Sequence, residues 1–372
     1  MGELTAREAL ITLNLVPGLG SVRIRSLLEF FGSAELALHA PQQMLAQVPR
    51  LGEKAAAALA DWRHCTQVHA ELECAEQLGA RVITFLDEEY PDALRRMSDP
   101  PVVLYALGAW QQEDAKRAVS LVGTRVATPY GMSCARRFAR ELADHAGCTI
   151  ISGLARGIDT AGHWGALDAD GRTVAVLGGG LGQLFPAENA ELVERIIAGH
   201  GAVVSEFPMN MRPSRNTFPQ RNRIVAAWSK ATLVAEASSR SGALHTARLS
   251  AEFGNQVFAI PGAITSIASL GCNRLIRDGA ILCNSPQELI ADMGWDQAPR
   301  QLNLFDTPTA ALPREQDPLL AAIAAGHNTL DALCSALGQP AHELTPRLMR
   351  LQIERKVLPG PGGQYELSKA GA

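Results

Sequence analysis

Cysteine is scarce in this chain of 372 residues, and no two cysteines stand in a C-x-x-C spacing. An odd number without that spacing argues against a zinc knuckle or a disulfide framework and favours a reducing compartment. Long apolar runs are also missing, since no stretch approaches the roughly 18–20 residues of a membrane helix. No basic segment followed by an apolar run opens the chain. We therefore expect a soluble cytoplasmic protein without a metal site. The cysteines are Cys65, Cys74, Cys134, Cys148, Cys272, Cys283 and Cys334.

Several catalytic motifs are absent as well. There is no Gly-Lys-Ser/Thr, so a P-loop ATPase is unsupported. The Gly178–Gly182 stretch does not follow G-x-G-x-x-G, which weakens a dinucleotide site. The histidines show no H-E-x-x-H or His/Cys metal spacing, and we expect His163 and His245 to be packed or hydrogen-bonded helix residues. The sequence thus predicts no cofactor and no enzyme activity.

The net charge of −4 argues, by itself, against a nucleic-acid partner. The distribution of charge argues the other way, because binding depends on the local field. No Asp or Glu occurs from Phe207 to Ala235, and a second basic group lies in another acid-free run. We therefore expect an asymmetric surface with a positive patch. The basic residues of the two groups are Arg212, Arg215, Arg221, Arg223 and Lys230, and Arg125, Arg136, Arg137 and Arg140.

The chain divides by pattern into four parts. Residues 1–78 have helical spacing, and residues 79–295 alternate short β-branched runs with amphipathic helices, which predicts an α/β fold with an extended Rossmann-like parallel sheet covered on both faces. Residues 296–316 read as a Pro-containing linker. Residues 317–370 predict three helices and a short hairpin, as in a winged helix. The predicted strands are 81–85, 102–105, 119–122, 149–151, 173–177, 202–204, 232–235, 256–260 and 280–282.

The N-terminal part contains two similar turns, Val16–Gly20 and Val48–Gly52, about 32 residues apart. They indicate a tandem helix-hairpin-helix unit of the SAM-like kind. The N–H groups of such turns contact a DNA backbone without reading sequence. The alternative is a structural docking module. It is favoured because Glu53, beside the second turn, reduces the positive charge there. In the C-terminal part, helix 341–356 carries Arg347 and Arg350, and either duplex binding or partner docking remains open.

We expect the loops at the carboxyl ends of the predicted strands to form the ligand-binding site, because ligands of open parallel sheets bind there. They combine small residues, which let phosphate approach backbone N–H groups, with Arg125 and Arg156. A row of such loops suits a strand of phosphates, and the alternative is a set of tight turns. The loops are Gly123–Arg125, Ser152–Gly157, Gly178–Gly180, Glu206–Pro208, Ser238–Gly242 and Pro261–Gly262.

The segment Phe218–Ile224 predicts a Pro-initiated helix start at which Arg221 and Arg223 flank Asn222. No acid lies nearby in sequence, which favours anion binding. The alternative is a solvated helix start whose arginines pair with distant carboxylates.

Six motifs resemble, in order, those of the DNA-processing protein A (DprA/Smf) family over roughly residues 80–290. The resemblance implies a non-catalytic protein that binds incoming single-stranded DNA, loads the RecA recombinase and supports natural transformation. It also implies a homodimer through Gly271–Cys283. The motifs are Leu121–Arg125, Ile151–Asp159, Ala175–Gly178, Phe218–Arg223, Glu236–Ala247 and Ala259–Gly262.

The sequence departs from the family pattern at four positions. Thr124 replaces a common serine, Gly182 an aspartate and Phe185 a tyrosine, while Ala187 stands where several members carry a lysine. The last change removes a phosphate contact, whereas Phe185 still offers a ring for stacking. We expect phosphates to bind the N–H groups of Gly123, Thr124, Gly153 and Gly242 and several arginines. The predicted DNA site comprises Gly123, Thr124, Arg125, Ser152, Gly153, Arg156, Phe185, Asn189, Gln220, Arg221, Asn222, Arg223, Ser241 and Gly242.

Three further hypotheses accompany this site. Gln301–Phe305 resembles the pentapeptide by which DNA-metabolism proteins bind the sliding clamp, and the alternative is an apolar linker segment tucked against its own domain.

The α/β domain also distantly resembles the LOG phosphoribohydrolases, in which case Glu206, Glu236 or Asp159 stabilises an oxocarbenium-like transition state. That family's Pro-Gly-Gly-x-Gly-Thr-x-x-Glu signature is missing here. A pure interaction scaffold, the third class, predicts no DNA binding at low salt.

Overall fold

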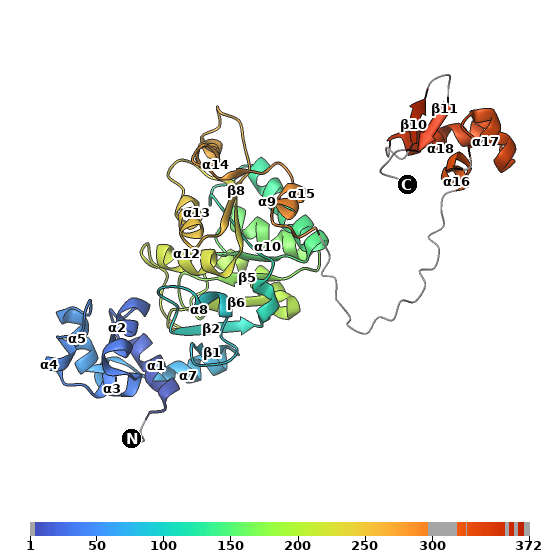
Figure 1. Cartoon of the computed structure of the whole chain (residues 1–372). Helices are drawn as coiled ribbons and strands as arrows, with labels where there is room; N and C mark the ends of the chain where they lie inside the picture. The colour runs from blue at the N-terminus through green and yellow to red at the C-terminus, as the bar shows by residue number, and fades with distance from the viewer. Residues whose placement is uncertain (1–3, 297–317, 325, 354–356, 361–363, 368–372) are drawn as a thin grey trace, which may run out of the picture. The chain divides into compact units, whose positions relative to one another are not determined.

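The computed structural model describes residues 4–296, 318–324, 326–353, 357–360 and 364–367. They belong to two compact units, divided between residues 299 and 300 (Figure 1). The predicted clamp-binding segment Gln301–Phe305 lies outside the described residues, as do residues 297–316 of the predicted linker. Within the described ranges, no helix is both long and apolar enough to cross a membrane.

A nine-stranded sheet forms the centre of the first unit, in the order β1-β2-β6-β5-β4-β3-β7-β8-β9. All nine predicted strands are confirmed. Most of them are buried on both faces, as their continuous apolar runs predict. The strands are β1 (Arg81–Thr84), β2 (Val103–Gly108), β3 (Ala118–Gly123), β4 (Thr149–Ser152), β5 (Thr173–Val176), β6 (Gly201–Ser205), β7 (Ala231–Glu236), β8 (Gln256–Ala259) and β9 (Ile281–Leu282).

The prediction of a wholly parallel sheet is wrong at one edge. Strands β3 to β9 are parallel, whereas β2 pairs antiparallel with both β6 and β1. Between β1 and β2 the chain forms only the four-residue helix α8 (Asp92–Arg95). A parallel pair is usually joined by a crossover helix that packs on the sheet, and the connection from β1 to β2 contains no such long helix.

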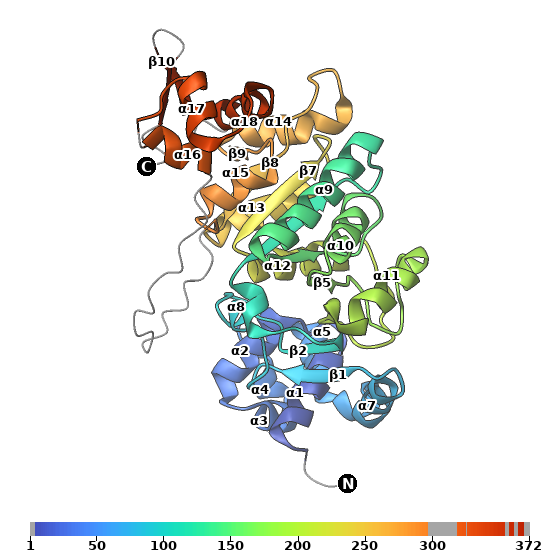
Figure 2. The ribbon, with the colours of Figure 1, turned by 90° about the vertical axis from the view of Figure 1, so that its right-hand side faces the viewer.

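Helices cover both faces of the sheet (Figure 2). Apolar residues of α9 (Pro129–Ala146), α10 (Ile158–Asp168) and α15 (Pro286–Asp292) pack with Val119, Leu121 and Leu233 on one face. Those of α12 (Thr217–Trp228), α13 (Ala243–Glu252) and α14 (Leu270–Arg277) pack with Val122, Val176 and Val234 on the other. The predicted double cover is therefore confirmed. The shorter elements are η1 (Gln112–Ala115), η2 (Ala187–Asn189), α11 (Ala190–Arg195), η3 (Ile196–His200) and η4 (Ile267–Ser269).

The N-terminal residues form a cluster of helices that shares a hydrophobic core with the β1-β2-β6 end of the sheet. Leu10 and Leu13 belong to the same buried cluster as Val82, Tyr105 and Val203. These helices therefore belong to the same compact unit as the sheet. They are α1 (Ala6–Leu15), α2 (Ser21–Phe31), α3 (Ala34–His39), α4 (Gln42–Leu45), α5 (Glu53–Ala60), α6 (Trp62–Cys65) and α7 (Val68–Gln77).

The two similar turns predicted from the sequence join α1 to α2 and α4 to α5. Gly18 and Arg50, at the same place in each turn, both have a positive φ, +79° and +65°. Arg23 ties the turns together, because its guanidinium donates to the carbonyl oxygens of both residues. The similarity in sequence is thus matched by a similar backbone and by direct contact.

The second unit consists of α16 (Pro318–Ala324), α17 (Leu330–Leu337), α18 (Ala341–Ile353) and the antiparallel strands β10 (Val357–Gly360) and β11 (Gln364–Leu367). These match the predicted helices and hairpin strands. Leu319, Leu333, Leu348 and Val357 form its small apolar core.

Candidate nucleic-acid interface

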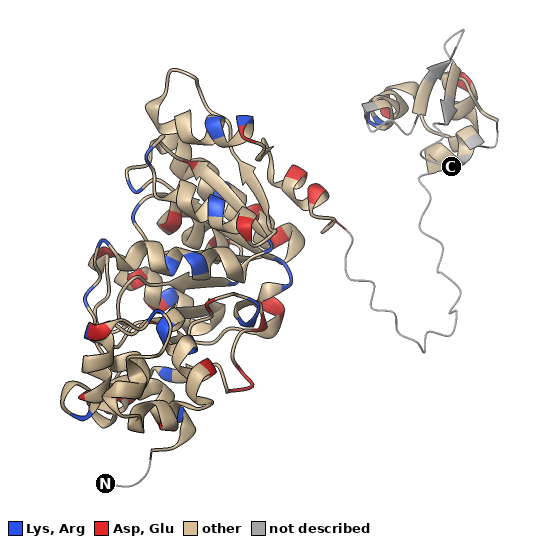
Figure 3. Ribbon diagram, turned by 60° about the vertical axis from the view of Figure 1, so that its left-hand side comes forward, with Lys and Arg blue, Asp and Glu red and all other residues tan. Residues whose placement is uncertain are grey.

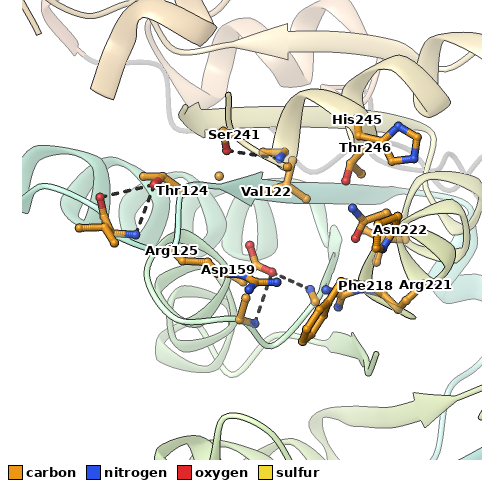
Figure 4. A pocket seen from close by; sticks show the side chains of 18 of the residues that line it. Val122, Thr124, Arg125, Asp159, Phe218, Arg221, Asn222, Ser241, His245 and Thr246 are labelled. Carbon is orange, nitrogen blue, oxygen red and sulfur yellow. Dashed lines mark hydrogen bonds between the residues drawn. The ribbon is translucent and has the colours of Figure 1, made fainter. Parts of the chain in front are cut away.

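A cavity of about 720 Å³ opens beyond the carboxyl ends of β3 and β4 (Figure 4). In the sheet, β3 lies between β4 and β7. From β3 the strands β4, β5 and β6 follow on one side, and β7, β8 and β9 follow on the other, so the strand order reverses at β3. Ligands of open α/β sheets bind at such points. Figure 4 shows Asp159, Phe218 and Arg221 on one side of the cavity, and Ser241, His245 and Thr246 on the other. The sequence-predicted residues Gly123, Thr124, Gly153, Asn222, Ser241 and Gly242 also line it.

Arg125 is an exposed cation of this cavity. It lies in the exposed loop after β3, with its guanidinium 4.4 Å from the centre of the Phe218 ring. Within the described part of the chain, its side chain forms no hydrogen bond or ion pair. A guanidinium stacked on an aromatic ring is oriented but not neutralised, so Arg125 can bind an anion.

Arg221 occupies a different environment, because its side chain is buried. Its guanidinium donates to the carbonyl oxygen of Val176, and its Nε has no hydrogen-bond partner in the described structure. Burial lowers the pKa of Arg221 to about 10, an effect that nearby Asp159 opposes. Arg221 thus lines the predicted site, but its guanidinium is buried and already donates to a backbone carbonyl oxygen.

Asp159 shapes the loop that precedes α10. Its carboxylate accepts hydrogen bonds from the N–H groups of Gly153 at 3.1 Å and Ala155 at 3.4 Å. Burial raises the pKa of Asp159, against the opposing charge of Arg221. A Cβ on Gly153 would collide with the Arg221 guanidinium, which explains glycine at this position.

Two of the predicted backbone donors are already engaged. The N–H of Thr124 donates to the carbonyl oxygen of Glu236 at 2.8 Å, and that of Gly153 donates to Asp159. The prediction that these N–H groups bind phosphate is therefore wrong for this conformation. The cationic side chains of this cavity therefore matter more for anion binding than the N–H groups of Thr124 and Gly153.

A second cavity of about 560 Å³ continues from the first and shares Arg215 and Phe218 with it. Phe185, which is 45% exposed, lies 6.1 Å from Phe218 between ring centres. Arg212 and Arg215 also line this cavity, and neither side chain has a hydrogen bond or ion pair with any described residue. The predicted site omitted both arginines, although the acid-free run Phe207–Ala235 contained them.

Ser152 and Asn189 lie close to the first cavity but are buried and serve the fold. The Ser152 hydroxyl donates to the carbonyl oxygen of Leu121 at 2.6 Å. The Asn189 side chain donates to the carbonyl oxygen of Leu154 and to Thr160 Oγ1, both at 2.9 Å. They therefore position loops, whereas the prediction had them contacting the ligand.

Arg223 faces away from both cavities. With Gln220 it lines a third hollow, against the Val16–Gly20 turn. Its guanidinium pairs with Glu206 and lies 3.4 Å from the Asp99 carboxylate, and its side chain is only 11% exposed. For Arg223 the structure therefore supports the alternative of pairing with distant carboxylates over the favoured anion binding, because Asp99 and Glu206 both reach it from elsewhere in the chain.

This burial gives a first prediction. Replacing Arg223 with alanine would leave Glu206 and Asp99 without their cation, and breaking a buried pair on one side costs roughly 3–5 kcal/mol. We expect a marked loss of thermal stability in Arg223→Ala, measured by calorimetry. Arg212→Ala, which removes an exposed and unpaired cation, is the control. Equal melting temperatures for the two variants would contradict a structural role for Arg223.

The two histidines have different environments. His163 is buried, contacts Thr173 Oγ1 at 2.6 Å, and has its pKa lowered to about 3 by burial, so the prediction of a packed residue is confirmed. His245 is exposed and lines the first cavity, so the same prediction is wrong there.

The three carboxylates considered for catalysis hold the fold together. Glu236 accepts hydrogen bonds from the N–H and hydroxyl of Thr128, at 2.8 and 2.6 Å. Glu206 pairs with Arg223, and Asp159 accepts backbone N–H groups. Each already has partners from the protein.

Comparisons with known proteins agree on one family. The model of the DNA recombination-mediator protein A family matches residues 81–294. A protein named Smf from Synechocystis is 33% identical over 94% of this chain and 96% of its own length. The structure of DNA processing protein A from Streptococcus pneumoniae superposes with a TM-score of 0.66, at 31% identity over 78% of this chain and 99% of that one. The structure of DNA processing protein A from Helicobacter pylori, which is described by its single-stranded DNA binding mode, superposes with a TM-score of 0.52. Its sequence is 29% identical, and the match covers 59% of this chain and 97% of that one.

Proposed function

The chain belongs to the DNA recombination-mediator protein A family, and from this premise we propose that it binds single-stranded DNA along the carboxyl edge of its sheet. One observation carries the proposal. Two joined cavities bring together the rings of Phe185 and Phe218 with Arg125, Arg212 and Arg215, three arginines that pair with no other described residue. Both signs of charge are interspersed over the first unit (Figure 3), so these unpaired cations matter more than the net charge.

The combination of cations and aromatic rings favours a single strand over a duplex. Bases of a single strand can leave the stack and lie on aromatic side chains, while arginines follow the phosphates. Bases of a duplex are stacked on each other and paired, so the rings of Phe185 and Phe218 cannot reach them. Neither cations nor rings select a base sequence, so we expect binding that depends steeply on salt and little on sequence.

We assign three roles to the residues in and beside the two cavities. Arg125, Arg156, Arg212 and Arg215 contact phosphates, with Arg221 adding charge from beneath. Phe185 and Phe218 stack on bases. Gly123, Thr124, Asn222, Ser241 and Gly242 form the polar wall of the first cavity.

The phosphoribohydrolase alternative is less favoured by this geometry. Such an enzyme needs a carboxylate free to face the sugar, yet Asp159, Glu206 and Glu236 are each engaged by protein donors. A role as a binding protein requires none of them to react. We therefore propose a non-catalytic mediator.

The wider role follows from the family. We propose that the protein acts in the cytoplasm, protects incoming single-stranded DNA, helps to load the RecA recombinase and supports natural transformation. We also propose a homodimer through Gly271–Cys283, which spans α14 and the edge strand β9. Ile281 and Leu282 of that strand are 36% and 44% exposed. Binding of the clamp through Gln301–Phe305 remains a proposal from sequence.

The flanking parts are interpreted in the same way. We propose that residues 1–78 are a tandem helix-hairpin-helix domain, that 79–295 form the DNA-binding domain, and that 317–370 are a winged helix after the linker. The pairing of the two turns through Arg23 supports the first assignment. Three helices followed by an antiparallel strand pair support the last.

A direct experiment tests the function. Labelled oligo-dT is titrated with the full chain by fluorescence anisotropy at low and moderate salt, with matched duplex as the competitor. We expect a preference for the single strand that weakens steeply with salt. Absence of single-strand binding at low salt would refute the proposal. Turnover of a nucleoside monophosphate in a parallel assay would support the enzyme instead.

A further inference from the structure

An exposed ion pair between Arg156 and Glu188 lies beside Phe185, whose side chain lines the second cavity. Arg156 belongs to the loop before α10, and Glu188 belongs to η2. The Arg156 Nε donates to Glu188 Oε1, and a terminal nitrogen donates to Oε2 at 3.2 Å, so the pair is bidentate. The side chains are 58% and 52% exposed, respectively. The pair is therefore formed where a ligand can reach it.

The neighbouring residue fixes the geometry of this pair. The Asn189 side chain is buried and donates to Leu154 in the Arg156 loop and to Thr160 in α10. The turn that carries Glu188 is thereby held against the loop that carries Arg156. A carboxylate held in this way meets the guanidinium with little further loss of side-chain entropy.

The same guanidinium is also placed for a DNA strand. Its carbon lies 5.8 Å from the centre of the Phe185 ring, one of the two rings of the proposed track. A base stacked on Phe185 would bring its phosphate near Arg156. The phosphate and Glu188 would then compete for the same bidentate donors, because the carboxylate and the non-bridging oxygens of a phosphodiester each offer two acceptors that share one negative charge.

We propose that Glu188 is an affinity-determining residue that competes with the DNA phosphate for Arg156. The proposal rests on the proposed function. A phosphate that binds Arg156 displaces one carboxylate from it, and that carboxylate stays close by as a negative charge. The strand is thus bound less tightly at Arg156 than at Arg125. When the strand dissociates, the ion pair between Glu188 and Arg156 forms again.

Removing the charge of Glu188 tests this directly. We expect Glu188→Gln to bind labelled oligo-dT about three- to fivefold more tightly, which is the upper part of the range for an exposed ion pair. The slope of log K against log salt should change by less than the value of about 0.7 for one phosphate contact on a single strand, because Arg156 already meets a phosphate in the wild type. The melting temperature should stay unchanged, because the pair is exposed.

Two further variants separate competition from a general charge effect. Glu191 is exposed, begins the next helix and pairs with no described residue, so Glu191→Gln makes the same charge change nearby and should alter affinity less than twofold. In an Arg156→Ala background, Glu188→Gln should lose its effect, which a double-mutant cycle measures.

The possible outcomes distinguish this proposal from the function it rests on. Unchanged or weaker binding by Glu188→Gln, with the wild type binding normally, would overturn the competition alone. A gain that persists in the Arg156→Ala background would do the same. If the wild type fails to bind single-stranded DNA at low salt, the proposed function itself falls.

Discussion

Replacement of Arg125 by alanine should weaken binding to single-stranded DNA by roughly 10- to 100-fold, the range for losing a hydrogen bond between charged groups. Arg125 is exposed, and its guanidinium lies over the Phe218 ring without a hydrogen bond or ion pair to any described residue. Its removal leaves no protein group unpaired, so the fold should be unaffected. The loss should therefore appear in binding and not in melting temperature.

The salt dependence checks the physical cause. Losing one phosphate contact should reduce the slope of log K against log salt by about 0.7. Arg125→Lys should recover part of the affinity, because a lysine keeps the charge but lacks the planar bidentate donors. Arg137→Ala is the control, since Arg137 is exposed on α9 and pairs with Glu141. If Arg125→Ala and Arg137→Ala bind equally well, the site lies elsewhere.

Substitution of Gly157 by alanine should have the largest effect on the fold around the site. Gly157 has a φ of +78°, which strains any residue with a Cβ. An added Cβ would also meet the carbonyl oxygens of Thr124 and of Arg125, the latter at 2.9 Å. Those are backbone atoms of the loop that carries Arg125, so they cannot rotate away. We expect a loss of about 3 kcal/mol or more from strain and overlap together.

Gly242→Ala provides the matched control for stability. Gly242 also borders the first cavity, but its φ is −63° and an added Cβ would have no atom within 4 Å. The melting temperature of Gly242→Ala should stay near that of the wild type. The melting temperature of Gly157→Ala should be several degrees lower, and this variant should also lose affinity for DNA. Equal stability of the two variants would show that the loops before α9 and α10 are not in the tight contact described.

Parts of the candidate site were predictable because they follow from local sequence. Loops after buried parallel strands must meet at one sheet edge, so Gly123–Arg125, Gly153 and Ser241–Gly242 were placed around one cavity correctly. Arg212 and Arg215 were visible in an acid-free run. Their inclusion required knowing that the loop before α12 borders Phe185 and Phe218.

The role of each arginine was not predictable in the same way. Arg221 and Arg223 are two residues apart on one helix, so they point in different directions from it. One is buried beneath the first cavity, and the other pairs with Asp99 and Glu206 in a different hollow. Arg156 is paired with Glu188, more than thirty residues away in sequence.

The sequence by itself determined the family, the nine strands, the helices between them and the edge of the sheet where ligands bind. These depend on local hydrophobic patterns and on ordered motifs, which are properties of short segments. Only the tertiary structure decided which arginines are free, which backbone N–H groups are already used, and that β2 runs antiparallel to its neighbours. Those outcomes depend on partners brought together from distant segments, because a charge is neutralised by whatever lies within a few ångströms of it in space.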